Sequence, residues 1–263
     1  MKPLTWTQDY QVTSFLVNLR GEAGLHAMLS FIQDVGWQHA LQLDVKLPKN
    51  FTWVFTRQKL VMRSWPKWKE TVTIKTWLRS NLTGPFLLRD YEIYRKDDLL
   101  GVATATFTAI DLTTRKIGEL DWNAFHQILP SHQQSLPITP EKIVFQTGKT
   151  QDLVTFQVRN SDLDLNFHVN NTKYAQWILD AIPIDTLTKG PHLHSYEVNF
   201  LAEAKLGNEI QLQLIEHEGL PAAPPPSALD GGDSSRIRFF QFQGQRKPDG
   251  KPIFTALLGA MEE

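Results

Sequence analysis

The 263-residue sequence contains no cysteine. This excludes disulfide bonds, cysteine-ligated metal sites and a cysteine nucleophile together. The histidines lack the spacing of metal ligands. The pair Gly231-Gly232 follows no predicted strand and so does not indicate a phosphate-binding loop. From these absences we expect neither a metal ion nor a cofactor.

Long apolar runs and an excess of one charge are missing too. No run approaches the roughly 20 apolar residues that a membrane-spanning helix needs, and residues 1–11 lack the hydrophobic region of a signal peptide. We therefore expect a cytoplasmic protein that does not insert into membranes. The formal net charge of −1 argues against a chain-wide attraction to nucleic acid. With 41% apolar residues, the chain has enough hydrophobic material for a buried core.

The sequence carries one pattern twice. Apolar residues at helical spacing predict one helix over residues 25–32 and a second over residues 174–181. Each is followed by alternating strand patterns, such as Val72-Thr-Ile74 in the first half and Ile210-Gln-Leu212 in the second. These segments superpose at a constant offset of 138 residues (210 − 72, and likewise 198 − 60). The repeat predicts two similar structural units.

Local signals mark where the predicted elements begin and end. We expect Asn170 and Asn171 to cap the second helix and Pro183 to end it. Both halves contain a predicted hairpin turn, one at residues 96–98 and the other at residues 247–250.

The composition divides the chain into two units and a connection. We expect an N-terminal unit over residues 1–129, a proline-containing linker over 130–149 and a C-terminal unit over 150–263. Residues 219–235, rich in Pro, Ala, Ser and Gly, are expected to form a surface loop. Each unit would contain a strand, one long helix and several antiparallel strands, and two such units can share a sheet and bury both helices.

The segment before the second helix holds the most informative polar residues. Asp164, Asn166 and His168 alternate with apolar residues, so an extended backbone would project them to one side. A carboxylate, an amide and an imidazole in one cleft can share a proton and orient a water molecule. The alternative is a polar loop that only leads into the helix cap, because Asp and Asn are common in such loops for local hydrogen bonding.

The same segment, residues 161–171 together with 174–177, resembles the acyl-acyl carrier protein thioesterases of plants and bacteria. The first half agrees at residues 53–57 and 65–68, and the resemblance runs in order over nearly the whole chain. It implies an α+β fold of two tandem hotdog units, each a long helix wrapped by an antiparallel β-sheet. It further implies hydrolysis of fatty acyl-acyl carrier protein thioesters in fatty acid biosynthesis, with acyl carrier protein as partner and a homodimer as assembly.

The resemblance also implies which residues are catalytic. Asp164, Asn166 and His168 fall on the family's catalytic Asp-x-Asn-x-His positions, and Glu203 falls on its catalytic glutamate. The next position, often cysteine in the family, is Ala204 here, which favours direct attack by water.

Each catalytic candidate has an expected role. Glu203, with His168, would position and deprotonate the water, and either of the two could accept the proton. Asn166 would hold the substrate carbonyl or the water, and Asp164 would fix Asn166 or the backbone leading into the helix. Backbone N–H groups at the start of that helix could polarise the carbonyl.

The first half lacks this catalytic pattern, because residue 203 corresponds to Trp65 at the offset of 138 (203 − 65). We expect the first unit to supply the acyl pocket instead. The candidate lining residues, which could equally be ordinary core residues, are Met28, Ile32, Trp37 and Trp53.

Basic residues gather within residues 59–69 and 89–96, where they could dock an acidic carrier protein or form a solvated charged face. Other functions remain open: an acyl-coenzyme A thioesterase, a hotdog dehydratase, and a non-catalytic acyl-binding protein. Glu203 argues against the dehydratase, and the presence of all four catalytic candidates argues against the binding protein.

Overall fold

The computed structural model describes residues 3–44, 47–79, 85–118, 128–129, 136–144, 149–216, 237–247 and 249–261. The chain divides into two compact units, Met1–Pro140 and Glu141–Glu263. The division falls inside residues 130–149, where the prolines predict a linker. The stretch predicted as a surface loop, residues 219–235, lies outside the described residues.

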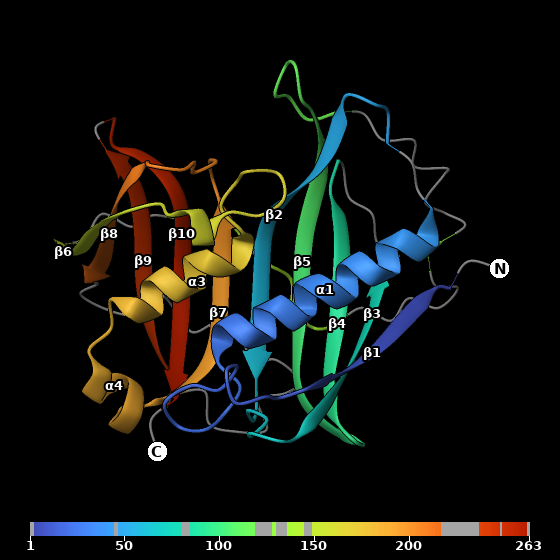
Figure 1. Ribbon diagram of the computed structural model, residues 1–263, viewed down its shortest axis with the longest axis horizontal. Coiled ribbons are helices and arrows are strands. Elements are labelled where there is room, and N and C mark those ends of the chain that lie inside the picture. The colour runs from blue at the N-terminus through green and yellow to red at the C-terminus, as the bar shows by residue number, and fades with distance from the viewer. Residues whose placement is uncertain are drawn as a thin grey trace. The chain divides into compact units, whose positions relative to one another are not determined.

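The first unit is an antiparallel sheet with a long helix across one face (Figure 1). The predicted turn at residues 96–98 is confirmed, because Arg95 pairs with Asp98 and leaves only two residues between their strands. The strands are β1 (Thr5–Gln11), β2 (Phe51–Met62), β3 (Thr71–Leu78), β4 (Leu87–Arg95) and β5 (Asp98–Asp111), in the spatial order β1-β3-β4-β5-β2.

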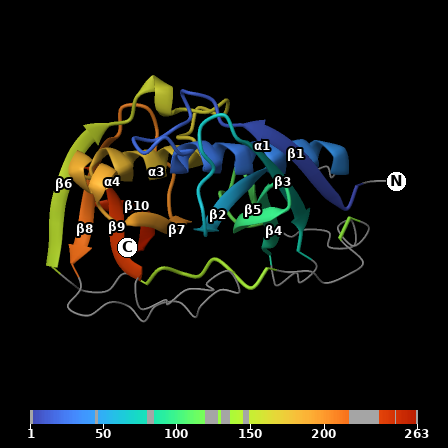
Figure 2. The same cartoon turned by 90° about the horizontal axis from the view of Figure 1, so that it is seen from below.

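The helix α1 (Leu25–Leu43) lies against this sheet with its apolar face (Figure 2). Met28 and Ile32, which predict that face, are both fully buried. A methyl group at Gly36 would come within 2.9 Å of the Tyr91 hydroxyl oxygen. Glycine at this position therefore lets the helix approach β4 closely.

Near this contact, His39 is buried against Arg89 of β4. Nη1 of Arg89 lies 2.7 Å from Nδ1 of His39, and Nε2 of His39 lies 3.0 Å from the carbonyl oxygen of Pro3. Because arginine can only donate, Nδ1 accepts and the neutral ring keeps its proton on Nε2. Burial, together with the neighbouring Arg89 charge, lowers the pKa of His39 from 6.5 to about 4.

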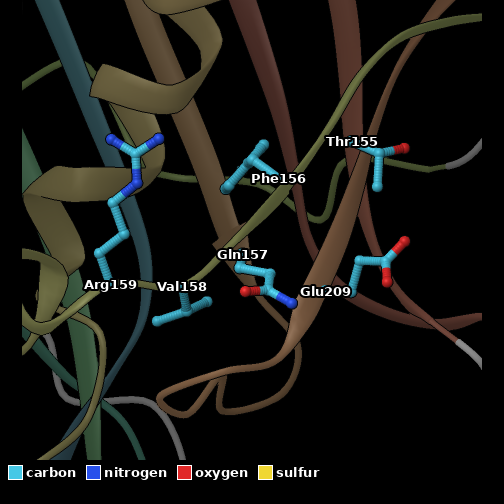
Figure 3. A pocket seen from close by; sticks show the side chains of 6 residues that line it. All are labelled: Thr155, Phe156, Gln157, Val158, Arg159 and Glu209. Atoms are coloured by element: carbon cyan, nitrogen blue, oxygen red, sulfur yellow. The ribbon is translucent and has the colours of Figure 1, made fainter.

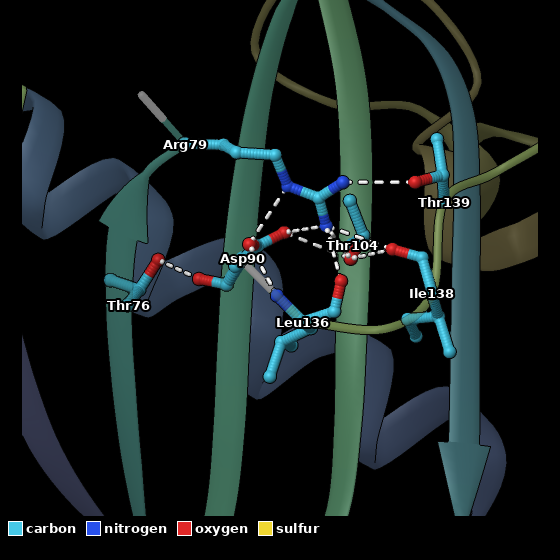
Figure 4. Close-up of polar contacts among 7 residues, drawn as sticks. All are labelled: Thr76, Arg79, Asp90, Thr104, Leu136, Ile138 and Thr139. Atoms are coloured by element: carbon cyan, nitrogen blue, oxygen red, sulfur yellow. Dashed lines mark hydrogen bonds and ion pairs between the residues drawn. The ribbon is translucent and has the colours of Figure 1, made fainter. Parts of the chain in front are cut away.

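The sheet face away from α1 holds a buried ion pair (Figure 4). Asp90 follows the alternation of β4 and points away from the side on which Tyr91 meets α1. Arg79 donates through Nε and Nη2 to both Asp90 carboxylate oxygens, at 2.9 and 2.7 Å. Arg79 also donates to the carbonyl oxygen of Ile138 at 2.8 Å, and the Leu136 amide donates to Asp90 at 3.2 Å. The segment that leaves the first unit is thereby bound to that unit's sheet.

The second unit repeats this order of elements. Its strand order corresponds, strand for strand, to that of the first unit. The predicted turn at residues 247–250 joins β9 to β10, and Gly250 has the positive φ, 63°, that such a turn favours. The strands are β6 (Lys149–Gln157), β7 (His192–Phe200), β8 (Glu209–Glu216), β9 (Ile237–Lys247) and β10 (Lys251–Met261), in the spatial order β6-β8-β9-β10-β7.

A 3₁₀ turn, η1 (Asn160–Asp162), and two short helices, α3 (Asn171–Asp180) and α4 (Ile184–Lys189), separate β6 from β7. The second helix ends before Pro183, as predicted, and is shorter than the long helix expected in each unit. Pro183 lacks a backbone N–H and its ring clashes with the preceding turn, so the chain restarts as α4. Among the described residues, no helix combines the length and the hydropathy needed to cross a membrane.

Buried polar side chains of β7 bind the segment that precedes β6. Glu197 accepts a hydrogen bond from the Glu141 amide at 2.7 Å. Asn199 accepts from the Ile143 amide at 2.8 Å and donates to the carbonyl oxygen of Glu141 at 2.9 Å. Both residues are buried, so water cannot reach their side chains. The backbone of this segment supplies the hydrogen-bond partners instead.

Acid should destabilise the protein through His39. As the pH falls from 7 towards 4, the unfolded chain binds a proton at this histidine that the folded chain does not bind. We expect a loss of up to about 3 kcal/mol of unfolding free energy from this group. Urea unfolding at both pH values should show a smaller loss for His39→Gln, which cannot titrate. Equal losses in the variant and the wild type would contradict this assignment.

Breaking the buried ion pair should cost far more than breaking an exposed one. Asp90→Ala leaves the Arg79 guanidinium buried without its carboxylate, and we expect a loss of about 3–5 kcal/mol of unfolding free energy. The matched control is Asp185→Ala, which removes an exposed pair with Lys189 and should cost less than about 1 kcal/mol. Chemical denaturation measures the unfolding free energy of both variants. Similar losses in the two would contradict the larger cost expected for the buried pair.

Candidate active site

A tight turn over residues 164–168 carries three of the catalytic candidates. The Asp164 carboxylate accepts hydrogen bonds from the backbone amides of Asn166, at 2.8 Å, and His168, at 3.3 Å. The Asp164 amide donates to the His168 carbonyl oxygen at 2.8 Å, and the Asp164 carbonyl oxygen accepts from the Phe167 amide at 3.0 Å. One aspartate therefore holds the turn through both its side chain and its backbone.

The extended backbone predicted for this segment is wrong. Phe167 has φ 60°, in the left-handed region, and the chain reverses between Asp164 and His168. The cause is the Asp164 carboxylate, because its bonds to amides two and four residues ahead close a turn. The turn exposes 98% of Leu165 and 79% of Phe167 and leaves His168 half-buried.

The turn leads directly into α3, whose predicted cap is confirmed. The Asn170 side-chain oxygen accepts from the amide and the hydroxyl of Thr172, both at 3.0 Å. The Asn170 carbonyl oxygen accepts from the Lys173 amide at 2.9 Å. Two amides that were candidates for polarising a substrate carbonyl, those of Thr172 and Lys173, are thus already bound to Asn170.

Glu203 lies in the loop between β7 and β8. Just before it, the amides of Leu201 and Ala202 both donate to the carbonyl oxygen of Ile253, at 2.8 and 3.1 Å. Just after it, Ala204 is fully buried and its carbonyl oxygen accepts from the Val169 amide at 3.4 Å. The backbone is held on both sides of Glu203, whose side chain remains 31% exposed.

His168 and Glu203 come together across these two loops. His168 Nε2 lies 3.7 Å from Glu203 Oε2, within ion-pair range and longer than a direct hydrogen bond. Their side chains are 37% and 31% exposed, so water can reach both. A carboxylate and an imidazole placed in this way can orient a water molecule and accept its proton.

Asp164 and Asn166 have different surroundings. The Asp164 carboxylate is bonded to the backbone amides of Asn166 and His168. Asn166 itself is exposed on the turn, where its side chain faces solvent. The aspartate therefore holds the backbone, and the asparagine is accessible to a substrate.

Tyr174 is a neighbour of the site that the sequence marks only as a core residue of the helix. Its hydroxyl group is hydrogen-bonded to the backbone of Ala204, and the residue is only 4% exposed. Burial, and then the charges of Glu203 and Asp164, raise the pKa of the Tyr174 hydroxyl, so the phenol stays protonated. A contact between residues 30 positions apart (204 − 174) leaves no signal in a single sequence.

The four candidate pocket residues of the first unit lie in different environments. Met28 and Ile32 are fully buried on α1, whereas Trp37 of the same helix is 63% exposed. Trp53 of β2 is half-buried and meets Phe107 edge-on, with ring centroids 5.5 Å apart. The structure therefore does not place Trp37 with Met28 and Ile32.

An open hollow of about 520 Å³ lies beside β6 (Figure 3). None of the four catalytic candidates lines it. Within the described ranges, no group of three or more His, Asp or Glu side chains is placed to hold a metal ion. The lining residues of the hollow are Thr155, Phe156, Gln157, Val158, Arg159 and Glu209.

Asp164→Ala should loosen the turn over residues 164–168, whereas Asp164→Asn should preserve it. Asparagine keeps a side-chain oxygen that can accept from the Asn166 and His168 amides, and alanine does not. We expect unfolding in urea to show a loss of about 1–3 kcal/mol for alanine and less than about 1 kcal/mol for asparagine. If both variants lost the same amount, the negative charge would be holding the turn rather than the acceptor.

Comparison with protein families identifies both halves of the chain. Residues 3–127 match the N-terminal domain of acyl-ACP thioesterases, and residues 146–222 match the C-terminal domain. The chloroplastic palmitoyl-acyl carrier protein thioesterase of Gossypium hirsutum is 25% identical over 215 residues, covering 75% of this chain and 50% of that protein. The chain thus spans about half the length of such curated relatives.

Solved structures share the fold over nearly the whole chain. An acyl-ACP thioesterase from Bacteroides thetaiotaomicron has a TM-score of 0.79 at 20% identity, covering 98% of each chain. The 12:0-ACP thioesterase from Umbellularia californica has a TM-score of 0.77 at 17% identity, covering 98% of this chain and 94% of that one. With both family domains matched in order, the chain belongs to the acyl-ACP thioesterase family.

Proposed function

We propose that this protein hydrolyses the thioester of a fatty acyl chain carried on acyl carrier protein, releasing the free fatty acid. The observation that carries the proposal is the pair of His168 and Glu203, 3.7 Å apart and accessible to water, in a chain of the acyl-ACP thioesterase family. The relatives' names include palmitoyl and 12:0 substrates, which supports the substrate class and leaves the chain length open.

The second part of the proposal concerns architecture. We infer two tandem hotdog units, with residues 1–129 forming a non-catalytic unit, 130–149 the connection and 150–263 the catalytic unit. The identical strand order of the two units supports this, as does Trp65 at the place that corresponds to Glu203. A homodimer and a cytoplasmic location stay predictions.

In the proposed reaction, water attacks the carbonyl carbon of the thioester. Glu203, with His168, orients the water and takes its proton as the new carbon–oxygen bond forms. The exposed Asn166 amide donates to the carbonyl oxygen as negative charge develops on it. The carbon–sulfur bond then breaks and the proton passes to the sulfur, giving a carboxylic acid and a thiol.

This route needs no cysteine nucleophile. Ala204, at the position often occupied by cysteine in the family, is fully buried. Its backbone is hydrogen-bonded to Val169 and to Tyr174, which fixes the residue inside the unit. The neighbouring Glu203 remains accessible, so the geometry supports water as the nucleophile and Glu203 as a group that activates it.

The acyl chain would be bound mainly by the first unit, to which we assign the pocket residues Met28, Ile32 and Trp53; the exposed Trp37 is left out of this set. The fully buried methionine and isoleucine would define the depth of such a pocket, and each buried methylene of substrate is worth about 0.8 kcal/mol.

Three of the grouped basic residues already have partners within the protein. Arg89 is buried against His39. Arg63 and Arg95 each form an ion pair with Asp98, at 2.9 and 3.0 Å. The proposal of an acyl carrier protein partner therefore rests on the family and on the active site, not on these clusters.

Thiol release from matched acyl-carrier and acyl-coenzyme A substrates tests the proposed function. We expect the carrier substrate to be cleaved faster, and Glu203→Ala and His168→Ala each to lower kcat by at least about 10²-fold. Asp185→Ala removes an exposed carboxylate of the same unit and should leave kcat unchanged.

Other outcomes select the alternatives. Preference for the coenzyme A substrate would make the protein an acyl-coenzyme A thioesterase. Binding of acyl chains without release of thiol from either substrate would make it a non-catalytic acyl-binding protein.

A further inference from the structure

Tyr174 lies behind the catalytic pair and is not used in the reaction described above. It is on the first turns of α3 and almost fully buried. Three aromatic rings surround its own: those of Trp177, Phe200 and Phe254, with centroid separations of 5.0, 5.3 and 5.0 Å. Packing on this many sides fixes the position of the phenol hydroxyl.

The hydroxyl group meets the backbone of Ala204, the residue that follows Glu203. The carbonyl oxygen of Ala204 accepts from the amide of Val169, the residue that follows His168. The backbone of Ala204 is therefore tied to α3 and to the catalytic turn. Ala204 follows Glu203 and Val169 follows His168, so these hydrogen bonds lie one residue away from the catalytic pair.

We propose that Tyr174 is a positioning residue that acts through the backbone of Ala204 to set the distance between Glu203 and His168. Its role in catalysis rests on the proposed hydrolase function. The aromatic cluster fixes the hydroxyl, the hydroxyl fixes Ala204, and Ala204 holds the loop of Glu203 against the turn of His168.

The protonation state of Tyr174 suits this role. Burial and the nearby carboxylates of Glu203 and Asp164 keep the phenol neutral, so it places no additional negative charge beside them. A neutral hydroxyl can accept one hydrogen bond and donate another. Phenylalanine would keep the ring packing and remove only the hydrogen-bonding group.

Tyr196 provides a matched control in the same unit. Like Tyr174 it is buried, but its hydroxyl oxygen has no hydrogen-bond partner among the described residues. Tyr196→Phe therefore removes the same atom from the same kind of environment without breaking a hydrogen bond.

The first measurement is steady-state hydrolysis of an acyl-carrier substrate. We expect Tyr174→Phe to lower kcat about 10-fold with little change in KM, and Tyr196→Phe to leave both unchanged. In the background of Glu203→Ala, Tyr174→Phe should cause no further loss, because the group it positions is gone. A further loss as large as in the wild type would overturn the proposal.

The second measurement does not depend on activity. Amide hydrogen exchange followed by NMR should be at least about 10-fold faster at Val169 and Ala204 in Tyr174→Phe, with the Thr255 amide unchanged as a reference in the β10 ladder. Unchanged exchange at Val169 and Ala204 would refute the positioning role. Faster exchange at Val169 and Ala204 in Tyr174→Phe, together with no thiol release by the wild-type protein, would refute only the hydrolase function.

Discussion

Polar side chains buried on the back of each sheet need hydrogen-bond partners, and the chain between the two units supplies them. In the first unit, Arg79 and Asp90 bind the backbone of residues 136–138. In the second, Glu197 and Asn199 bind the backbone of residues 141–143. A buried ionised group left without such partners costs several kcal/mol. The predicted linker is therefore a structural part of both units, each of which is completed by its own half of it.

The polar side chains on the back of each sheet thus have their hydrogen-bond partners. The two units differ on the other side, which faces the helix. In the first unit α1 approaches that side closely at Gly36. In the second unit the shorter helix α3 begins shortly after the turn over residues 164–168, and its Tyr174 reaches the loop that carries Glu203. The same order of elements thus serves packing in one unit and brings polar groups together in the other.

The sequence predicts elements better than it predicts the contacts between them. Helix spacing, the cap at Asn170 and both hairpin turns follow from local chemistry, and the structure confirms them. The alternation around Asp164 was misleading, because its carboxylate bonds to local amides and turns the chain. The sequence places Arg89 in a basic cluster that could face solvent, but tertiary packing buries it. The approach of Glu203 to His168 was expected only by resemblance, since no local pattern encodes it.

The left-handed backbone of Phe167 has a consequence for how this chain can change. A bulky residue rarely adopts φ 60°, and here the hydrogen bonds of Asp164 hold it there. The two positions are therefore epistatic: substitutions at 167 that favour this conformation, such as glycine or asparagine, should make the turn less dependent on the aspartate. Whether a substitution at residue 164 is tolerated depends on which residue occupies position 167, so the two positions do not change independently.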